Sequence, residues 1–279
     1  MKPLLKWVGG KTQILNQVLA EFPRTIENYY EPFLGGGSVL LGLLSSDIQV
    51  KGKIYASDVN PTLINFYTVL KEKPHHLYTC FCVLLSEYAS SEDKEHFYYQ
   101  IRAMFNQMAR TGPEHAATFL FLNKTCFRGV YREGPSGFNV PFGHYKALPN
   151  VDETHILDIS KAIQRVEFRC KDFLSVFTNI QKGDFVYVDP PYVPETMTSF
   201  VGYVADGFSS RTYTTLFSAL QTTPATFVMS NSDVTIVRDA FPSPFQTKKI
   251  VARRAIHSKD PSSTTMEVLI TNATIRQDL

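Results

Sequence analysis

The feature that most constrains the fold of this chain is an alternation of short apolar runs with helical patterns. Each run is rich in β-branched and aromatic residues and ends in glycine, proline or polar residues, after which a helical spacing follows. The runs are Asn28–Phe33, Lys53–Asp58, Val166–Cys170, Phe185–Val188 and Thr226–Met229. This alternation predicts an α/β fold around a mostly parallel sheet, with ligands bound at the carboxyl ends of the strands.

The middle of the chain differs from both ends. From Thr62 to about Leu122 the pattern is helical and shows no convincing strand, and residues 123–150 follow as a stretch rich in glycine, proline, aromatic and basic residues. A loop of this length is usually functional or disordered, and its aromatic content argues against disorder. We therefore expect residues 62–146 to form an inserted helical domain ending in a binding loop, and residues 1–61 and 147–279 to form the sheet domain.

Composition is that of an ordinary globular protein, with 44% hydrophobic and 19% charged residues. The formal net charge of +2 gives no indication of a polyanionic partner. Residues 245–259 form a basic run without acidic residues, which is only a weak indication of nucleic-acid binding because such runs are usually solvated surface. In the same region, Gln246–Ala252 is expected to pair antiparallel with Thr265–Thr271 as an edge hairpin.

The four cysteines do not follow a zinc-binding pattern, because Cys80-x-Cys82 is too short for a knuckle and no second pair is present. Reduced thiols in an intracellular protein are expected instead, and no metal. The segment up to Lys11 contains no apolar region typical of a secretory signal, and no apolar run is long enough to span a membrane.

The most specific local motif is Asp189-Pro190-Pro191-Tyr192, which follows the predicted strand Phe185–Val188. The prolines stiffen the turn, so that a carboxylate, a carbonyl group and an aromatic ring point toward one small volume. Asp189 and the Pro190 carbonyl could each accept a hydrogen bond from an exocyclic amine, while Tyr192 stacks on its ring. The alternative is a rigid turn that ends the strand and has no chemical role.

Glycine-rich segments indicate a nucleotide-like ligand. Gly10-Lys11-Thr12 resembles the end of a phosphate-binding loop, but Leu5 stands where that loop requires glycine. Gly35-Gly36-Gly37 follows a predicted strand and precedes a predicted helix, which allows a ligand to approach the backbone. A dinucleotide-binding motif would need another glycine three positions after Gly37, where Leu40 stands, so a dinucleotide ligand is disfavoured. Asp58 is placed to accept hydrogen bonds from ribose hydroxyls, or alternatively to cap the helix that follows it.

These motifs together resemble a Dam-like DNA adenine-N6 methyltransferase over essentially the whole chain. The matching segments are Lys6-Trp7-x-Gly9-Gly10-Lys11, Glu31-Pro32-Phe33 with its glycine turn, Asp58-x-Asn60, residues 138–143, Asp172-Phe173 and Asp189-Pro190-Pro191-Tyr192. The resemblance implies a Rossmann-like seven-stranded methyltransferase sheet with an inserted helical target-recognition domain. It also implies S-adenosyl-L-methionine as the cofactor.

The resemblance assigns roles to individual residues. Lys11 would reach the methionine carboxylate and Asp172 the adenine amino group of the cofactor, whereas Trp7 would pack beside the sulfonium or else serve as core packing. The implied cofactor-binding residues are Trp7, Lys11, Glu31, Phe33, Gly35, Gly37, Asp58, Asp172, Phe173 and Asp189, and the implied catalytic residues are Asp189, Pro190 and Tyr192.

The loop after residue 122 resembles the family's DNA-recognition hairpin. Phe127 matches an aromatic wedge that helps to extrude the adenine, and Arg132 matches an arginine that recognises guanine. The implied DNA-binding residues are Lys6, Lys124, Phe127, Arg128, Val130, Arg132, Asn139, Pro141, Arg253 and Arg254. Arg128 stands where the best-known members have asparagine. The alternative is that the basic residues of the loop contact only phosphates.

The sequence therefore predicts a site-specific DNA methyltransferase that acts on adenine N6 in a short palindrome, GATC first and CATG second. The alternatives are a cytosine-N4 DNA methyltransferase and a catalytically silent DNA-binding protein. Expected partners are double-stranded DNA and a restriction endonuclease acting separately, and the protein is expected to be a monomer.

Overall fold

The computed structural model of the chain describes residues 1–194, 208–253 and 264–273. It divides the chain into two compact units. The first consists of Met1–Thr12, Gly35–Ser45 and Asn60–Cys170, and the second consists of Gln13–Leu34, Ser46–Val59 and Lys171–Leu279.

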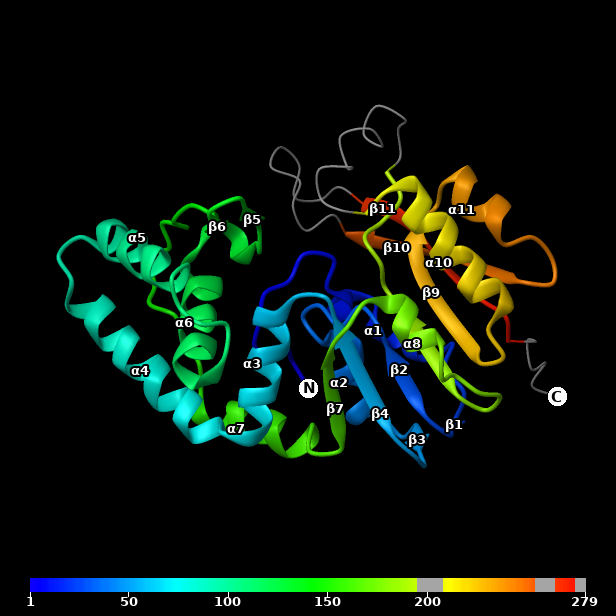
Figure 1. Cartoon of the computed structure of the whole chain (residues 1–279), viewed down its shortest axis with the longest axis horizontal. Coiled ribbons are helices and arrows are strands. Elements are labelled where there is room, and N and C mark those ends of the chain that lie inside the picture. Colours follow the sequence, from blue (N-terminus) through cyan, green and yellow to red (C-terminus); the bar gives the residue numbers. More distant parts are fainter. Residues whose placement is uncertain (195–207, 254–263, 274–279) are drawn as a thin grey trace. The chain divides into compact units, whose positions relative to one another are not determined.

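The fold is built on a seven-stranded sheet with the strand order β10-β11-β9-β8-β2-β4-β7 (Figure 1). The strands are β2 Tyr29–Glu31, β4 Ile54–Asp58, β7 Val166–Cys170, β8 Phe185–Val188, β9 Thr226–Ser232, β10 Gln246–Arg253 and β11 Thr264–Thr271. Strand β2 is parallel to β4 and β8, and β8 is parallel to β9. Strand β11 is antiparallel to both β9 and β10. The predicted mostly parallel α/β sheet and its edge hairpin are confirmed.

The second unit covers β8 on both faces, which explains why this strand is an unbroken apolar run. Val186 and Val188 face a core formed with helices α8 (Phe173–Phe177), α10 (Ser210–Thr222) and α11 (Thr235–Ala240). Phe185 and Tyr187 face the other way, and their ring centroids lie 4.4 and 5.7 Å from that of Phe22, which follows helix α1 (Leu15–Leu19). All four strand residues are buried, so the end of β8 is held firmly in place.

The first unit contains the helices expected in the middle of the chain. They are α3 Pro61–Glu72, α4 Pro74–Ser90, α5 Lys94–Phe105 and α6 Gly112–Thr125, followed by α7 Glu153–Ala162. Helix α6 packs against α3, α4 and α5, and almost all of its residues are buried (Figure 1). A helix that is buried all round is a core element, so α6 is the centre on which the other helices pack.

Short elements complete the structure. The first unit has helix α2 (Ser38–Leu44), the turn η2 (Phe127–Gly129) and a small hairpin of β5 (Glu133–Gly134) and β6 (Gly137–Phe138). The remaining elements are η1 (Lys11–Gln13) and the parallel pair β1 (Thr25–Ile26) and β3 (Gln49–Val50). Among the described residues, no helix is both long and apolar enough to cross a membrane. None of the four cysteines forms a disulfide.

Candidate functional site

Three acidic residues stand at the carboxyl ends of neighbouring parallel strands in the second unit. Asp58 ends β4, Glu31 ends β2, and Asp189 directly follows β8. In the sheet, β2 lies between β8 and β4. The strands that follow β2 in the chain, β4 and β7, lie on one side of it, and the later strands β8 and β9 lie on the other. Open α/β sheets bind their ligands at such a reversal of strand order.

Asp189 is held by a hydrogen bond that the sequence did not suggest. Ser230 on β9 donates its hydroxyl to Asp189 Oδ1 at 2.8 Å, and the same hydroxyl lies 3.1 Å from that of Tyr187. Ser230 and Tyr187 are fully buried, whereas Asp189 is partly exposed. A carboxylate that accepts a hydrogen bond from a buried hydroxyl keeps a defined orientation.

The rest of the Asp-Pro-Pro-Tyr turn is tied to β9, β11 and α10. The Tyr192 hydroxyl donates to Glu267 Oε2 at 2.7 Å, and the Tyr213 hydroxyl donates to the Pro191 carbonyl at 3.0 Å. The amide of Val193 donates to Asn231 Oδ1 at 3.0 Å. Burial, together with the charges of Asp189 and Glu267, raises the pKa of Tyr192 well above its ordinary value, so the hydroxyl stays protonated. The turn is rigid, and it also presents a carboxylate.

Residues 230–232 were missed by the sequence interpretation, although a signal was present. The run Ser-Asn-Ser continues β9 directly after apolar residues, and all three side chains are buried. Buried polar side chains at the carboxyl end of a strand require specific partners. The Nδ2 atom of Asn231 is buried and has no hydrogen-bond partner among the described residues.

Glu31 is a buried acid that stays protonated near neutral pH. Glu31 is only 2% exposed, and the Tyr29 hydroxyl donates a hydrogen bond of 2.7 Å to its Oε2 atom. Burial raises the pKa of Glu31, the hydrogen bond from Tyr29 lowers it, and the negative charge of Asp189 raises it, so that the pKa lies at about 8. A neutral Glu31 leaves Asp189 without a second negative charge at the end of the neighbouring strand.

The second unit also contains an aromatic cluster. The rings of Phe33 and Phe173 are stacked with centroids 5.5 Å apart, and Phe208 meets Phe33 edge-on at 5.9 Å. Asp172, predicted to bind the cofactor adenine, accepts a hydrogen bond of 2.9 Å from the Leu174 amide and caps helix α8. This local bond fixes the direction of its carboxylate.

The alternative explanation of Asp58 as a helix cap is wrong. Asn60 caps α3, because its Oδ1 accepts hydrogen bonds from the amides of Thr62 and Leu63 at 3.0 and 3.2 Å. Asp58 is partly exposed, and its carbonyl accepts from the amide of Lys171 at 3.1 Å.

In the first unit, the glycine turn packs closely against Trp7. A Cβ atom at Gly35 would lie 2.9 Å from Trp7 Cδ1, and one at Gly36 would lie 2.7 Å from Trp7 Cβ. On another side, the Trp7 ring stacks on that of Tyr131 with centroids 5.6 Å apart and planes inclined by 21°. Trp7 remains partly exposed. The glycines therefore let an indole, and not only a ligand, approach the backbone.

Lys11 is almost fully buried, at 3% exposure. Its amide donates to Ser38 Oγ at 3.0 Å, and its Nζ atom donates to the Gly9 carbonyl at 2.5 Å. These bonds hold the N-terminal segment against the start of helix α2. The ammonium group lies close to the backbone of the Gly9–Gly10 turn.

The buried side-chain amide of Asn123 bonds to both the N-terminal segment and the predicted recognition loop. Asn123 accepts from the Lys6 amide at 2.9 Å and donates to the carbonyls of Lys6 and Gly129 at 2.8 and 3.2 Å. The loop then turns through left-handed backbone at Arg128 and Gly129, with φ of 56° and 67°. This turn leaves the side chain of Phe127 47% exposed, with the Arg128 guanidinium 5.2 Å from its ring centroid.

The small hairpin connects two residues that the sequence assigned to DNA. Arg132 Nε donates to Asn139 Oδ1 at 2.7 Å, and the Asn139 amide donates to the Arg132 carbonyl at 3.1 Å. Both residues are exposed, as is Pro141, whereas Val130 is half-buried.

The other predicted DNA-binding cations differ in their surroundings. Lys124 has an intramolecular partner, because its Nζ atom donates to the Leu4 carbonyl at 2.5 Å. Burial, together with the charges of Lys6 and Lys2, lowers the pKa of Lys124 to about 8. Lys6 is exposed, and its Nζ lies 4.5 Å from the Tyr145 ring centroid. Arg253 is the last residue of β10, and Arg254 lies outside the described residues.

Comparison with known proteins identifies the family. Residues 7–256 match the D12 class N6 adenine-specific DNA methyltransferases, which is most of the chain. The chain belongs to this family. A type II methyltransferase, M.MjaIII of Methanocaldococcus jannaschii, is 37% identical over 273 residues, covering 93% of this chain and 94% of the relative. The DNA adenine methylase of Haemophilus influenzae is 31% identical over 93% of this chain and 89% of its own length.

The predicted enzyme class is thereby confirmed: the chain is an adenine-specific DNA methyltransferase of the D12 class. The methyltransferase family implies S-adenosyl-L-methionine as the methyl donor. The names of the type II relatives are consistent with a restriction-modification context.

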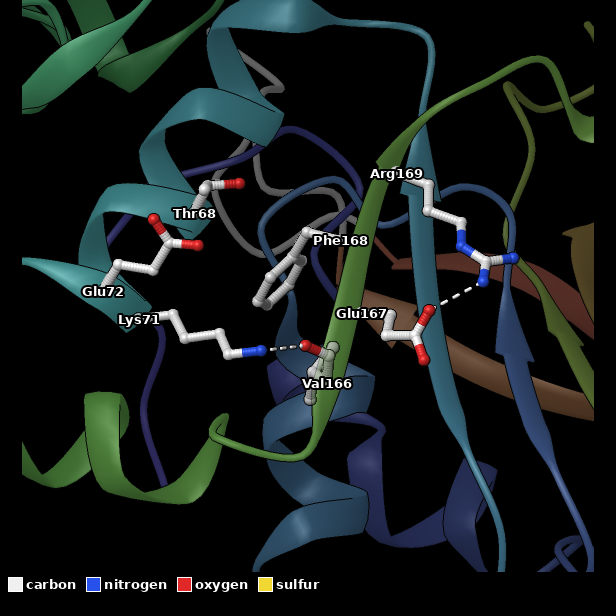
Figure 2. A pocket seen from close by; sticks show the side chains of 7 residues that line it. All are labelled: Thr68, Lys71, Glu72, Val166, Glu167, Phe168 and Arg169. Carbon is white, nitrogen blue, oxygen red and sulfur yellow. Dashed lines mark hydrogen bonds and ion pairs between the residues drawn. The ribbon is translucent and has the colours of Figure 1, made fainter.

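A cavity of about 260 Å³ in the first unit of this D12 methyltransferase does not contain any predicted site residue. Figure 2 shows it between helix α3 and strand β7, lined among others by Thr68, Glu72 and Phe168. Lys71 Nζ donates to the Val166 carbonyl at 2.8 Å across it. The cavity is therefore partly closed by a bond to the backbone of β7, and we assign it no role in methyl transfer.

Proposed function

We propose that the enzyme transfers a methyl group from S-adenosyl-L-methionine to N6 of an adenine extruded from a short palindromic DNA site. GATC is the favoured site and CATG the second. The observation that carries the proposal is the carboxylate of Asp189, which is partly exposed, oriented by buried Ser230 and placed at the carboxyl end of β8.

The chemistry follows from the weak nucleophilicity of an aromatic amine. The lone pair of adenine N6 is delocalised into the ring, so the nitrogen reacts only if this delocalisation is reduced. Asp189 and the Pro190 carbonyl would accept the two N6 hydrogens and favour a pyramidal nitrogen, which stabilises the transition state more than the ground state. Tyr192, whose hydroxyl is bonded to Glu267, would offer its ring to the base. S-adenosyl-L-methionine supplies, when bound, a methyl group on a positively charged sulfur.

The residues present fit this cofactor. Phe33, which is partly buried and stacked on the buried ring of Phe173, offers an apolar surface for a purine, and Asp58 at the end of β4 offers acceptors for ribose hydroxyls. Trp7 is partly exposed, and we assign its indole to contact with the sulfonium. The residues that we assign to the cofactor are those predicted from the sequence: Trp7, Lys11, Glu31, Phe33, Gly35, Gly37, Asp58, Asp172, Phe173 and Asp189.

We assign DNA recognition to residues 62–146 and catalysis to residues 1–61 and 147–279. Adenine N6 is inaccessible within the duplex, so the base must be flipped out of the stack. Phe127 is suited to fill the space that the base leaves, because it is a large apolar side chain with 47% exposure on a surface turn. Arg132 and Asn139, joined to each other and exposed, offer hydrogen-bonding groups to base edges in the major groove.

Further parts of the proposal concern the setting of the enzyme. Double-stranded DNA is its substrate, a cognate restriction endonuclease acts separately on the same site, and the methyltransferase works inside the cell as a monomer. Arg253 and Arg254 are assigned to phosphate contacts, which contribute affinity that falls with salt.

The test is methylation of a plasmid with the purified enzyme, followed by base-resolved mapping of the modified positions. The expected product is N6-methyladenine in a single short palindrome. Modification of cytosine N4 would establish the alternative activity, and sequence-specific DNA binding without methyl incorporation would establish a silent DNA-binding protein. Asp189→Ala is expected to abolish methyl transfer while most DNA or cofactor binding remains, and near wild-type turnover of this variant would refute the mechanism.

A further inference from the structure

We propose that His76, Cys80 and Glu114 bind one zinc ion on the surface formed by helices α4 and α6. Their ligand atoms, one from each side chain, lie within 4.8 Å of one another. His76 and Cys80 are four residues apart on α4 and therefore share one face of that helix. Glu114 comes from the first turn of α6.

The separations are close to those of a tetrahedral zinc site. With zinc–ligand bonds of about 2.0–2.3 Å, neighbouring ligand atoms of a tetrahedron lie about 3.3–3.6 Å apart. His76 Nε2 and Glu114 Oε1 are already 3.5 Å apart. The Cys80 sulfur has to move by no more than about 1.5 Å relative to these atoms, which rotation of a side chain provides. Water would occupy the fourth position.

Packing of the two helices fixes the backbone positions of the three ligand residues. On α4, Leu77 and Phe81 each follow one of the two ligands and are fully buried. On α6, His115 and Ala116 follow Glu114 and are buried as well. Figure 1 shows α4 running beside α6, and the contacts between the two helices are extensive. A site on packed helices keeps its geometry better than a site on loops.

The set of ligand atoms selects the metal. One imidazole nitrogen, one thiolate and one carboxylate oxygen suit zinc, whereas magnesium and calcium prefer oxygen atoms throughout. The side chains of His76 and Glu114 are 54% and 62% exposed, so an ion can enter from solvent. None of the three residues belongs to the catalytic, cofactor or DNA-binding sets. The ion would therefore tie α4 to α6 and take no part in methyl transfer.

The chain offers a matched control for two of the three ligands. Cys82 lies two residues beyond Cys80 on the same helix and is also half-buried. His75 precedes His76 and is also exposed, with 73% of its side chain accessible against 54% for His76. The test uses the reduced, full-length protein after removal of metals with a chelator. Cobalt(II) serves as the probe, because a cobalt–thiolate bond gives a charge-transfer band in the near ultraviolet, and zinc is then added to displace it.

The expected result is one equivalent of cobalt with a thiolate band that zinc removes. Cys80→Ser should abolish the band and Cys82→Ser should leave it, while His76→Ala should weaken binding at least tenfold and His75→Ala should not. Zinc should raise the melting temperature of the wild type and of Cys82→Ser but not of Cys80→Ser. Circular dichroism of each metal-free variant verifies folding. The proposal is overturned if the wild type shows no saturable band, if Cys80→Ser keeps it, or if Cys82→Ser loses it equally.

Discussion

The hydroxyl of Ser230 on β9 donates a hydrogen bond of 2.8 Å to the carboxylate of Asp189, which follows β8. The two residues come from adjacent parallel strands, and the serine is fully buried. The carboxylate that we propose to bind the target amine is thus oriented by a residue of the neighbouring strand. Loss of this bond should change the reaction without removing any group that contacts the substrate.

Ser230→Ala is expected to lower the rate of methyl transfer by about 10- to 100-fold. A hydrogen bond to a charged group contributes about 1.5–3 kcal/mol, and each 1.4 kcal/mol corresponds to a tenfold change in rate. Single-turnover kinetics at saturating DNA and cofactor would measure the effect, with Ser218→Ala on the exposed face of α10 as the control. If Ser230→Ala keeps the wild-type rate and only binds DNA more weakly, the positioning role is refuted.

Glu31→Gln is expected to flatten the dependence of stability on pH. Because the pKa of Glu31 rises from 4.5 to about 8 on folding, the folded protein retains a proton that the unfolded chain releases. The stabilisation is complete below pH 4.5 and is lost as pH rises through about 8, with a slope of up to about 1.4 kcal/mol per pH unit. Denaturant unfolding at pH 5.5, 7 and 8.5 would show a steeper decline for the wild type.

The matched control for this measurement is Glu27→Gln, an exposed glutamate that is paired with Lys51. It measures the effect of the same chemical substitution at an exposed position. Burial also lowers the pKa of His115 to about 4, which makes stability rise with pH in acid, but this effect is common to all three proteins. An equal slope for Glu31→Gln and the wild type would show that Glu31 is ionised in the folded protein.

Gly37→Ala is expected to destabilise the first unit by about 2–4 kcal/mol, because two effects add. Gly37 has φ of 67°, and a Cβ atom there would lie 2.5 Å from the Tyr67 hydroxyl oxygen. Gly112 has φ of 86° but its nearest neighbour would be 3.5 Å away, so Gly112→Ala isolates the backbone strain of about 1 kcal/mol. Thermal unfolding would compare them, and Tyr67→Phe should restore part of the loss in a double variant. Equal destabilisation by both alanines would contradict the steric argument.

Arg132→Ala is expected to relax discrimination at one guanine of the recognition site. A bidentate contact with a base contributes about 1–3 kcal/mol of discrimination, whereas a phosphate contact lowers the affinity for all sequences equally. Methylation rates on a set of duplexes with single base changes would measure this. Lys146→Ala, in the same loop and exposed, should lower all rates alike. A uniform decrease for Arg132→Ala would reassign it to phosphate.

The sequence by itself determined the local structure and the family. Strands β7 and β8 have the predicted ends, because strand patterns and the glycines and prolines that terminate them are local properties. The motif at residues 189–192 was correctly placed at the end of a strand, and the family match confirms the enzyme class.

The tertiary structure alone decided which side chains meet. Ser230 contacts Asp189 across 41 positions and Glu267 contacts Tyr192 across 75, and these pairs exist because the sheet order makes β9 a neighbour of both β8 and β11. Hydrophobic periodicity tells which face of an element is buried, but not which element packs against it. The convergence of Glu114 with the imidazole and thiol of α4 arises in the same way from helix packing.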